Sequence, residues 1–152
     1  MEHGMALTNE DLLSLYNLYA LATRLISEGD VEGWVDLFTE DAEFIIPPIE
    51  RLDSPGFTMK GPQDLRQFIT QHLDGTFDRQ LGLPEGTKKR YLTSNILLEE
   101  SSDGGVEGSA YSTILLLHNG TTNFFGTGVY KDHFVRGTEG WKIARRHLTP
   151  DA

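Results

Sequence analysis

The last sixty residues constrain the fold most, because they hold four strand-like segments in succession. These segments are 89–99, 106–118, 122–135 and 141–148. Side chains in the first of them alternate with the two-residue period of a pleated strand. Asp103-Gly104-Gly105 and Asn119-Gly120 follow the first two segments with residues that tolerate the positive φ of tight hairpin turns. We therefore expect an antiparallel meander that is long enough to curl.

Two glycines in the third segment indicate where this sheet bends. Gly126 and Gly128 weaken a plain strand, and a glycine inside a strand often marks a bulge or the close approach of another backbone. A strongly curved sheet needs such points. We expect a bulge or a close backbone contact near these residues.

The N-terminal half carries helical patterning. Thr8 and Asp11 have the spacing of a capping box, and Gly29 is placed to end the first helix. The apolar stripe between them consists of Leu12, Leu15, Tyr19, Ala22 and Ile26. Such helical spacing predicts a helix with one face packed on the core.

Three further elements follow. Asp30 is expected to cap a short second helix that carries Trp34, Leu37 and Phe38. A short strand is predicted over 42–46, which prolines 47 and 48 stop. A third helix begins near Pro62. Its apolar face holds Leu65, Phe68, Ile69, His72 and Leu73. Helices come first and most strands later, so the fold class is α+β.

Composition bounds the organisation and the partners. The chain has 152 residues with 38% hydrophobic content, which predicts a single domain over residues 1–152. Its net charge of −10 opposes binding to nucleic acid or to anionic membranes. There is no cysteine, no signal-peptide pattern and no apolar stretch near the roughly 20 residues of a membrane span, so we expect a cytoplasmic protein. The irregular segments 47–60 and 74–88 are long enough to form lids or interface loops.

Three stretches together resemble one family. They are EGDVEGWVDLFTEDAEF (28–44), KGPQDLRQFI (60–69) and GTGVYKDHFVRGTEGWKIARRH (126–147). In their order along the chain they look like the SnoaL-like branch of the nuclear transport factor 2-like (NTF2-like) superfamily. The resemblance implies a cone: a strongly curved, mainly antiparallel sheet packed on three N-terminal helices around an apolar pocket. It also implies a homodimer formed through the outer face of the sheet.

The resemblance further implies where catalytic residues would stand. Relatives of the scytalone dehydratase and lindane dehydrochlorinase type pair an Asp near the end of the first helix with a His on the first strand of the meander. In this chain those two positions fall on Ser27 and Tyr91. Neither member of the dyad is present. A phenol with a pKa of about 10 is a poor base at neutral pH, so Tyr91 is better suited to donate a proton or a hydrogen bond.

His72 is the candidate that could replace the missing imidazole. It lies on the apolar face of the third helix, which in this family looks into the pocket; the alternative is a core histidine whose nitrogen is satisfied by a backbone carbonyl. The catalytic candidates are therefore Tyr91, His72 and Ser27, and the expected pocket-lining residues are Tyr19, Phe44 and Asn95. His147 lies on the last segment, where the pattern leaves its face undecided, and His3 lies in an N-terminus expected to be loose.

Metal and cofactor motifs are missing from the sequence. There is no H-E-x-x-H, no cysteine pair and no glycine-rich loop that opens a helix. We therefore expect neither a metal nor a cofactor.

Three functions remain open. The first is a lyase or isomerase of the dehydratase type, acting on an apolar polyketide, terpenoid or aromatic metabolite. The second is a non-catalytic ligand-binding protein that keeps the pocket. The third is a structural subunit, because YKDHFVRGTEGWKIARRHL (130–148) also resembles the end of ring-hydroxylating dioxygenase β subunits. The first two share one partner, a small apolar molecule in the pocket.

Two structural expectations follow. The residues predicted to be buried between helices and sheet are Leu15, Tyr19, Trp34, Phe38, Phe44, Phe68 and Ile69. Residues 114–117 are apolar on both faces of their segment, so one set must face something other than the pocket. This predicts a homodimer through the meander.

Overall fold

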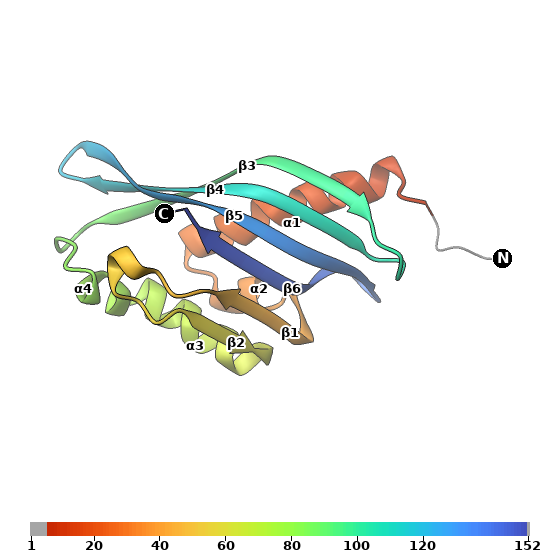
Figure 1. Cartoon of the computed structure of the whole chain (residues 1–152), viewed down its shortest axis with the longest axis horizontal. Coiled ribbons are helices and arrows are strands. Elements are labelled where there is room, and N and C mark those ends of the chain that lie inside the picture. The colour runs from red at the N-terminus through yellow and green to blue at the C-terminus, as the bar shows by residue number, and fades with distance from the viewer. Residues whose placement is uncertain (1–5, 152) are drawn as a thin grey trace.

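A computed structural model describes residues 6–151, so His3 lies outside the described residues. Its elements are α1 (Asn9–Glu28), α2 (Val31–Val35), β1 (Phe38–Ile46), the 3-10 helix η1 (Glu50–Leu52), β2 (Phe57–Lys60), α3 (Gly61–Leu73), α4 (Thr76–Gln80), β3 (Lys88–Glu100), β4 (Val106–His118), β5 (Thr121–Gly137) and β6 (Gly140–Pro150) (Figure 1). The fold class is α+β, as predicted. Within residues 6–151, no helix has the length and apolar character needed to cross a membrane.

All the strands form one sheet, in the order β2-β1-β6-β5-β4-β3. The pairs from β3 to β6 are antiparallel, as the hairpin turns predicted, and β1 runs parallel to β6. Helix α1 runs behind the sheet and contacts β3 and β6, while α3 packs against β1 and β2 (Figure 1). Register shifts interrupt each of the three meander ladders, and such bulges increase the local twist.

The two glycines of β5 lie where the sheet bends. A register shift separates the pairs Ile114↔Gly126 and Leu115↔Phe124, which confirms the predicted irregularity. A Cβ atom on Gly128 would lie 2.8 Å from the carbonyl oxygen of Thr149, closer than packing allows. Gly128 therefore permits the close approach of β6.

The start of α1 matches its sequence signature. The Thr8 hydroxyl accepts from the Asp11 amide and the Asp11 carboxylate accepts from the Thr8 amide, both at 3.0 Å, which completes the capping box. Gly29 ends the helix in the left-handed conformation, with φ of 74°. The Asp11 carboxylate also accepts from two guanidinium nitrogens of Arg136 at 2.9 Å and from Trp141 Nε1 at 3.2 Å. One side chain therefore caps α1 and fastens it to β5 and β6.

The second helix is shorter than predicted. Asp30 caps α2 as expected, but the helical placement of Leu37 and Phe38 is wrong. Phe38 opens β1, where it pairs with Ile143 of β6 and packs edge-on against Trp34 with ring centroids 4.8 Å apart. Strand pairing with a distant part of the chain outweighs the local helical pattern, so β1 begins earlier than the predicted strand.

The predicted core is confirmed with one exception. The buried members of the predicted set are Leu15, Tyr19, Trp34, Phe38, Phe44 and Ile69. Phe68 is half-buried and packs against Phe44 and Phe57, with ring centroids 5.9 and 5.4 Å apart. It stays partly exposed because its ring borders a cavity described below.

The two segments predicted to be irregular contain regular elements. Residues 47–60 hold η1 and β2, and residues 74–88 hold α4. Strand β2 pairs antiparallel with β1, with Met59 opposite Phe44. The sequence pattern misses these elements because each is five residues or shorter and depends on tertiary pairing.

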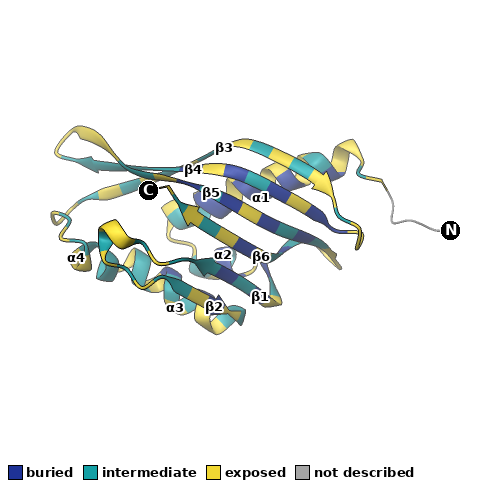
Figure 2. Cartoon of the chain, viewed as in Figure 1, coloured by how far each residue is buried: buried dark blue, intermediate teal, exposed yellow. Residues whose placement is uncertain are grey.

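The outer face of the sheet carries exposed apolar side chains. Along β4, β5 and β6 buried and exposed residues alternate (Figure 2). The exposed set includes Leu92 at 45%, Tyr111 at 54% and Phe124 at 79%. His147 is exposed as well, which settles the face of β6 that it occupies, because its neighbour Arg146 is buried.

Candidate functional site

A cavity of about 720 Å³ opens between the helices and the sheet. Its walls come from the end of α1, from α2, α3 and α4, from the segment around η1, and from all the strands. The apolar side chains that line it include Trp34, Phe44, Phe57, Phe68, Ile69 and Ile114. A mainly apolar hollow of this size with a few polar groups is typical of a small-molecule site.

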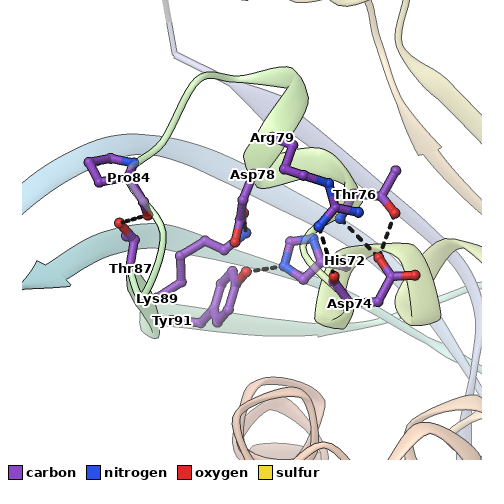
Figure 3. Close-up of polar contacts among 9 residues, drawn as sticks. All are labelled: His72, Asp74, Thr76, Asp78, Arg79, Pro84, Thr87, Lys89 and Tyr91. Atoms are coloured by element: carbon purple, nitrogen blue, oxygen red, sulfur yellow. Dashed lines mark hydrogen bonds and ion pairs between the residues drawn. The ribbon is translucent and has the colours of Figure 1, made fainter.

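Tyr91 and His72 meet inside this cavity. Tyr91 comes from β3 and His72 from α3, and the phenol oxygen is hydrogen-bonded to the imidazole Nε2 (Figure 3). The imidazole is enclosed by aromatic rings, because Phe68 and Phe77 each lie 6.0 Å from it between centroids. The apolar stripe of α3 predicted that His72 faces the pocket. In the structure His72 contacts Tyr91, which stands where the family resemblance places a histidine.

Burial sets the protonation of both groups. Burial, assisted by the positive charge of Lys89, lowers the pKa of His72 to about 4. Burial also raises the pKa of Tyr91 well above its ordinary value. At neutral pH the pair is thus an uncharged imidazole and an uncharged phenol. It can donate a hydrogen bond or a proton to a bound oxygen, and it is a weak base.

An ion pair lies beside this hydrogen bond. Lys89, two residues before Tyr91 on β3, contacts Asp78 of α4 (Figure 3). The two side chains are mostly buried, with 12% and 20% exposed. The hydrogen bond joins β3 to α3 and the ion pair joins β3 to α4, so both hold the helical wall of the cavity against the sheet.

A buried arginine lies in the same cavity. Arg146 of β6 donates from Nε to Asp132 at 2.8 Å and from Nη2 at 3.3 Å. Its guanidinium carbon lies 4.0 Å from the centroid of the Tyr130 ring and 5.7 Å from that of Tyr19. Burial alone would lower the pKa of Arg146, but the charge of Asp132 and its hydrogen bonds raise it. Arg146 is therefore a permanent cation inside a mainly apolar cavity.

Sequence reasoning missed this pair, because the register that the turn predicts is not the observed one. A tight turn at Thr138 and Glu139, with Gly137 opposite Gly140, would by itself place Asp132 opposite Arg145. A register shift between His133 and Phe134 brings Arg146 opposite Asp132 instead. Opposite charges facing one another across a hairpin stabilise the pairing. The burial of the pair depends on the curvature of the sheet, which the local pattern does not contain.

The sequence candidates divide into two groups. Tyr91, His72 and Phe44 line the cavity. Tyr19 does not: it is 1% exposed and packs edge-on against Phe134 at 5.4 Å, behind the cavity wall. Its predicted place in the lining is corrected to the core, because its ring fills the space between α1 and the sheet.

Ser27 and Asn95 lie away from the cavity lining. Ser27 is exposed, and its hydroxyl donates to the carbonyl of Thr23 on its own helix at 3.3 Å. Ser27 directly follows Ile26, a residue of the apolar stripe, so its side chain points about 100° around the helix axis from that of Ile26. Asn95 is exposed at the bulge of β3 with φ of 55°, where the inward and outward alternation is broken. The expected place of the catalytic candidate Ser27 near the pocket and the pocket-lining place of Asn95 are therefore corrected.

Metal-binding side chains do not gather anywhere within residues 6–151. The described part of the chain has no cluster of three or more His, Asp or Glu residues that could hold a metal ion. The polar side chains that line the cavity are those of Arg51, Asp53, Ser54, Gln71, His72, Gln80, Lys89, Tyr91, Ser112, Thr127, Tyr130 and Arg146.

Comparison with known proteins identifies the family. The model of the SnoaL-like domain matches residues 8–147, so the chain belongs to the SnoaL-like family. The solved structure of Aln2 from a Streptomyces species superposes with a TM-score of 0.76 at 22% identity, covering 97% of this chain and 95% of that one. An NTF2-like protein with a cystatin-like fold from Novosphingobium aromaticivorans gives 0.69 at 21% identity, covering 93% and 82%. The fold is thus the NTF2-like cone that the sequence resemblance implied.

A curated relative adds a different kind of likeness. The chain is 26% identical over 149 residues to the anthranilate 1,2-dioxygenase small subunit of Burkholderia cepacia. The match covers 93% of this chain and 89% of the relative.

Proposed function

We propose that the cavity binds a small, mainly apolar molecule and that Tyr91 and His72 contact an oxygen atom of it. The reaction we propose is a proton transfer of the lyase or isomerase type that needs no cofactor. The hydrogen-bonded Tyr91–His72 pair inside a cavity of about 720 Å³ carries this proposal. The substrate class that fits is an aromatic, terpenoid or polyketide metabolite, since aromatic and aliphatic side chains form most of the lining.

The protonation states define what the pair contributes. With the pKa of His72 lowered to about 4, the imidazole is neutral and removes protons only weakly at neutral pH. The Tyr91 phenol keeps its proton and can donate it toward a carbonyl oxygen as negative charge develops there. The His72 nitrogen holds the phenol in place and can exchange a proton with it. Tyr91 is therefore the proposed donor and His72 the proposed positioning and relay group.

The first test replaces the phenol. In Tyr91→Phe, binding of para-phenylphenol is expected to weaken by about tenfold, because a hydrogen bond inside an apolar site is lost. Binding of unsubstituted biphenyl is expected to stay within about twofold. Calorimetric titration measures both, with Tyr111→Phe as the matched control, since Tyr111 carries its phenol on the outer face of the sheet. Equal weakening of both ligands, or none of either, would contradict the role given to Tyr91.

A second candidate function rests on the curated relative. Likeness to a dioxygenase small subunit over 93% of the chain supports a role as a structural subunit, whose surface rather than its cavity would carry the function. The homodimer expected from the sequence would use the outer face of the sheet. The cytoplasmic location stays a prediction.

Assembly tests the outer face. We propose that Leu92, Tyr111 and Phe124 lie in a homodimer contact, because exposed apolar side chains on one sheet face favour a covering partner. Tyr111→Lys is expected to shift the mass from dimer to monomer in light scattering at micromolar concentration. Leu13→Lys is the control, since Leu13 is 62% exposed but lies on α1. A parent protein that is monomeric, or a control that dissociates equally, would refute this contact.

A further inference from the structure

A line of polar side chains crosses the inner face of the sheet from β3 to β6. Its members are Tyr91, Ser112, Tyr130 and Arg146, and all of them line the cavity. The pairing registers place them on a diagonal. Tyr91 lies two residues from Thr93, which pairs with Ser112. Tyr130 lies two residues from Gly128, which also pairs with Ser112. Arg146 lies two residues from Leu148, which pairs with Tyr130.

This diagonal separates its two ends. Tyr91 and Arg146 lie on strands three steps apart, which puts the strand axes roughly 14 Å from one another. Between them on the sheet lie the hydroxyls of Ser112 and Tyr130, and most of the other residues that line the cavity are apolar. The cavity therefore offers polar contacts at two ends of an elongated ligand.

The Arg146 end has an unused donor. Its Nε and Nη2 atoms donate to Asp132, and within residues 6–151 Nη1 makes no hydrogen bond. In the described part of the chain, the fully enclosed polar side-chain atoms without a partner are Tyr19 Oη, Trp34 Nε1 and Thr93 Oγ1. Nη1 is not among them, so it keeps accessible surface. Because Arg146 is only 2% exposed and lines the cavity, that surface faces the cavity.

A buried cationic N–H without an acceptor is costly, so a ligand that supplies one gains affinity. We infer that the ligand carries a carbonyl or carboxylate oxygen at the end remote from Tyr91 and that Arg146 binds this oxygen through Nη1. The inference rests on the proposed function for the other end of the ligand, where Tyr91 contacts a first oxygen. Arg146 is then a specificity-determining residue, since a ligand without the second oxygen leaves its donor unpaired.

Biphenyl ligands fit this test because the ring pair is rigid and linear. The full probe has a para hydroxyl on one ring and a para carboxylate on the other, and a second probe has an acetyl group in place of the carboxylate. The reference is para-phenylphenol, which lacks the second oxygen function. Wild-type protein is expected to bind at least one of the two longer probes about tenfold more tightly than the reference, as measured by calorimetric titration.

Two variants attribute this gain to Arg146. Arg146→Lys keeps the charge beside Asp132 but loses the guanidinium fork, and the gain is expected to disappear. Arg146→Met combined with Asp132→Leu removes the pair as a whole, so that no unpaired buried charge disturbs folding, and it should also lose the gain. The readout in both is the ratio of the affinities for the longer probe and for para-phenylphenol, which should fall from about tenfold to about one. Arg145→Met is the matched control, because Arg145 is exposed on the same strand.

The outcomes separate this inference from the proposed function. A gain from carboxylate or acetyl that survives in both Arg146 variants, or no gain from either group in the wild type, overturns the inference. In those cases weaker binding of para-phenylphenol by Tyr91→Phe would leave the proposed function standing. If Tyr91→Phe changes nothing, the proposed function fails, whatever Arg146 does.

Discussion

Replacing Asp132 with alanine is expected to cost about 3–5 kcal/mol in the free energy of unfolding, because it leaves the Arg146 charge buried and unpaired. The side chains of the pair are 0% and 3% exposed, and Arg146 Nε donates to Asp132 at 2.8 Å. Urea unfolding at neutral pH measures the loss, and the melting temperature should fall by roughly 10 °C.

Two controls decide whether the unpaired charge is the cause. Asp132→Leu combined with Arg146→Met should recover much of the lost stability, since apolar replacement of a whole buried ion pair is often neutral. Glu28→Ala breaks the exposed ion pair with Arg24, whose side chains are 56% and 74% exposed, and should change stability by less than about 0.5 kcal/mol. A double variant as unstable as Asp132→Ala alone would show that the loss comes from packing around Tyr130.

Short sequence motifs correctly predicted where several helices and strands begin or end. The capping box of Thr8 and Asp11, the left-handed Gly29 and the Asn119-Gly120 turn each act over four residues or fewer, and each is found where the sequence placed it. Elements that depend on distant partners were missed. Strand β2 exists because it pairs with β1, and α4 is held by the contact of Asp78 with Lys89.

The candidate site shows the same division. The helical stripe and the family resemblance placed His72 and Tyr91, whose meeting needs only the phase of α3 and of the first half of β3. Alternation along β3 also placed Asn95 inward, but the bulge after Ser94 turns it out, and no local pattern announced that bulge. The inward position of Arg146 depends on the bulge at Ala144, which the local pattern did not announce either.

The second large effect concerns His72 and pH. In the unfolded chain this imidazole takes up a proton near its ordinary pKa of 6.5, whereas in the folded protein burial lowers the pKa to about 4. Between these values the unfolded state binds more protons, so stability is complete above about pH 6.5 and falls as the pH drops toward 4. The difference between the two pKa values corresponds to roughly 3 kcal/mol.

His72→Gln should remove this dependence while leaving an amide that can still bond to Tyr91. Urea unfolding between pH 7 and pH 4 is therefore expected to give a flatter stability profile for His72→Gln than for the wild type. His147→Gln, which removes an exposed imidazole from the outer sheet face, serves as the control. The contribution of Asp11 falls in a different range: Arg136 lowers the pKa of that carboxyl below its ordinary 3.8, so its stabilisation is lost mainly below pH 4. Parallel profiles for the wild type and His72→Gln would mean that the imidazole reaches water in the folded protein, and the uncharged Tyr91–His72 pair would then no longer describe the site.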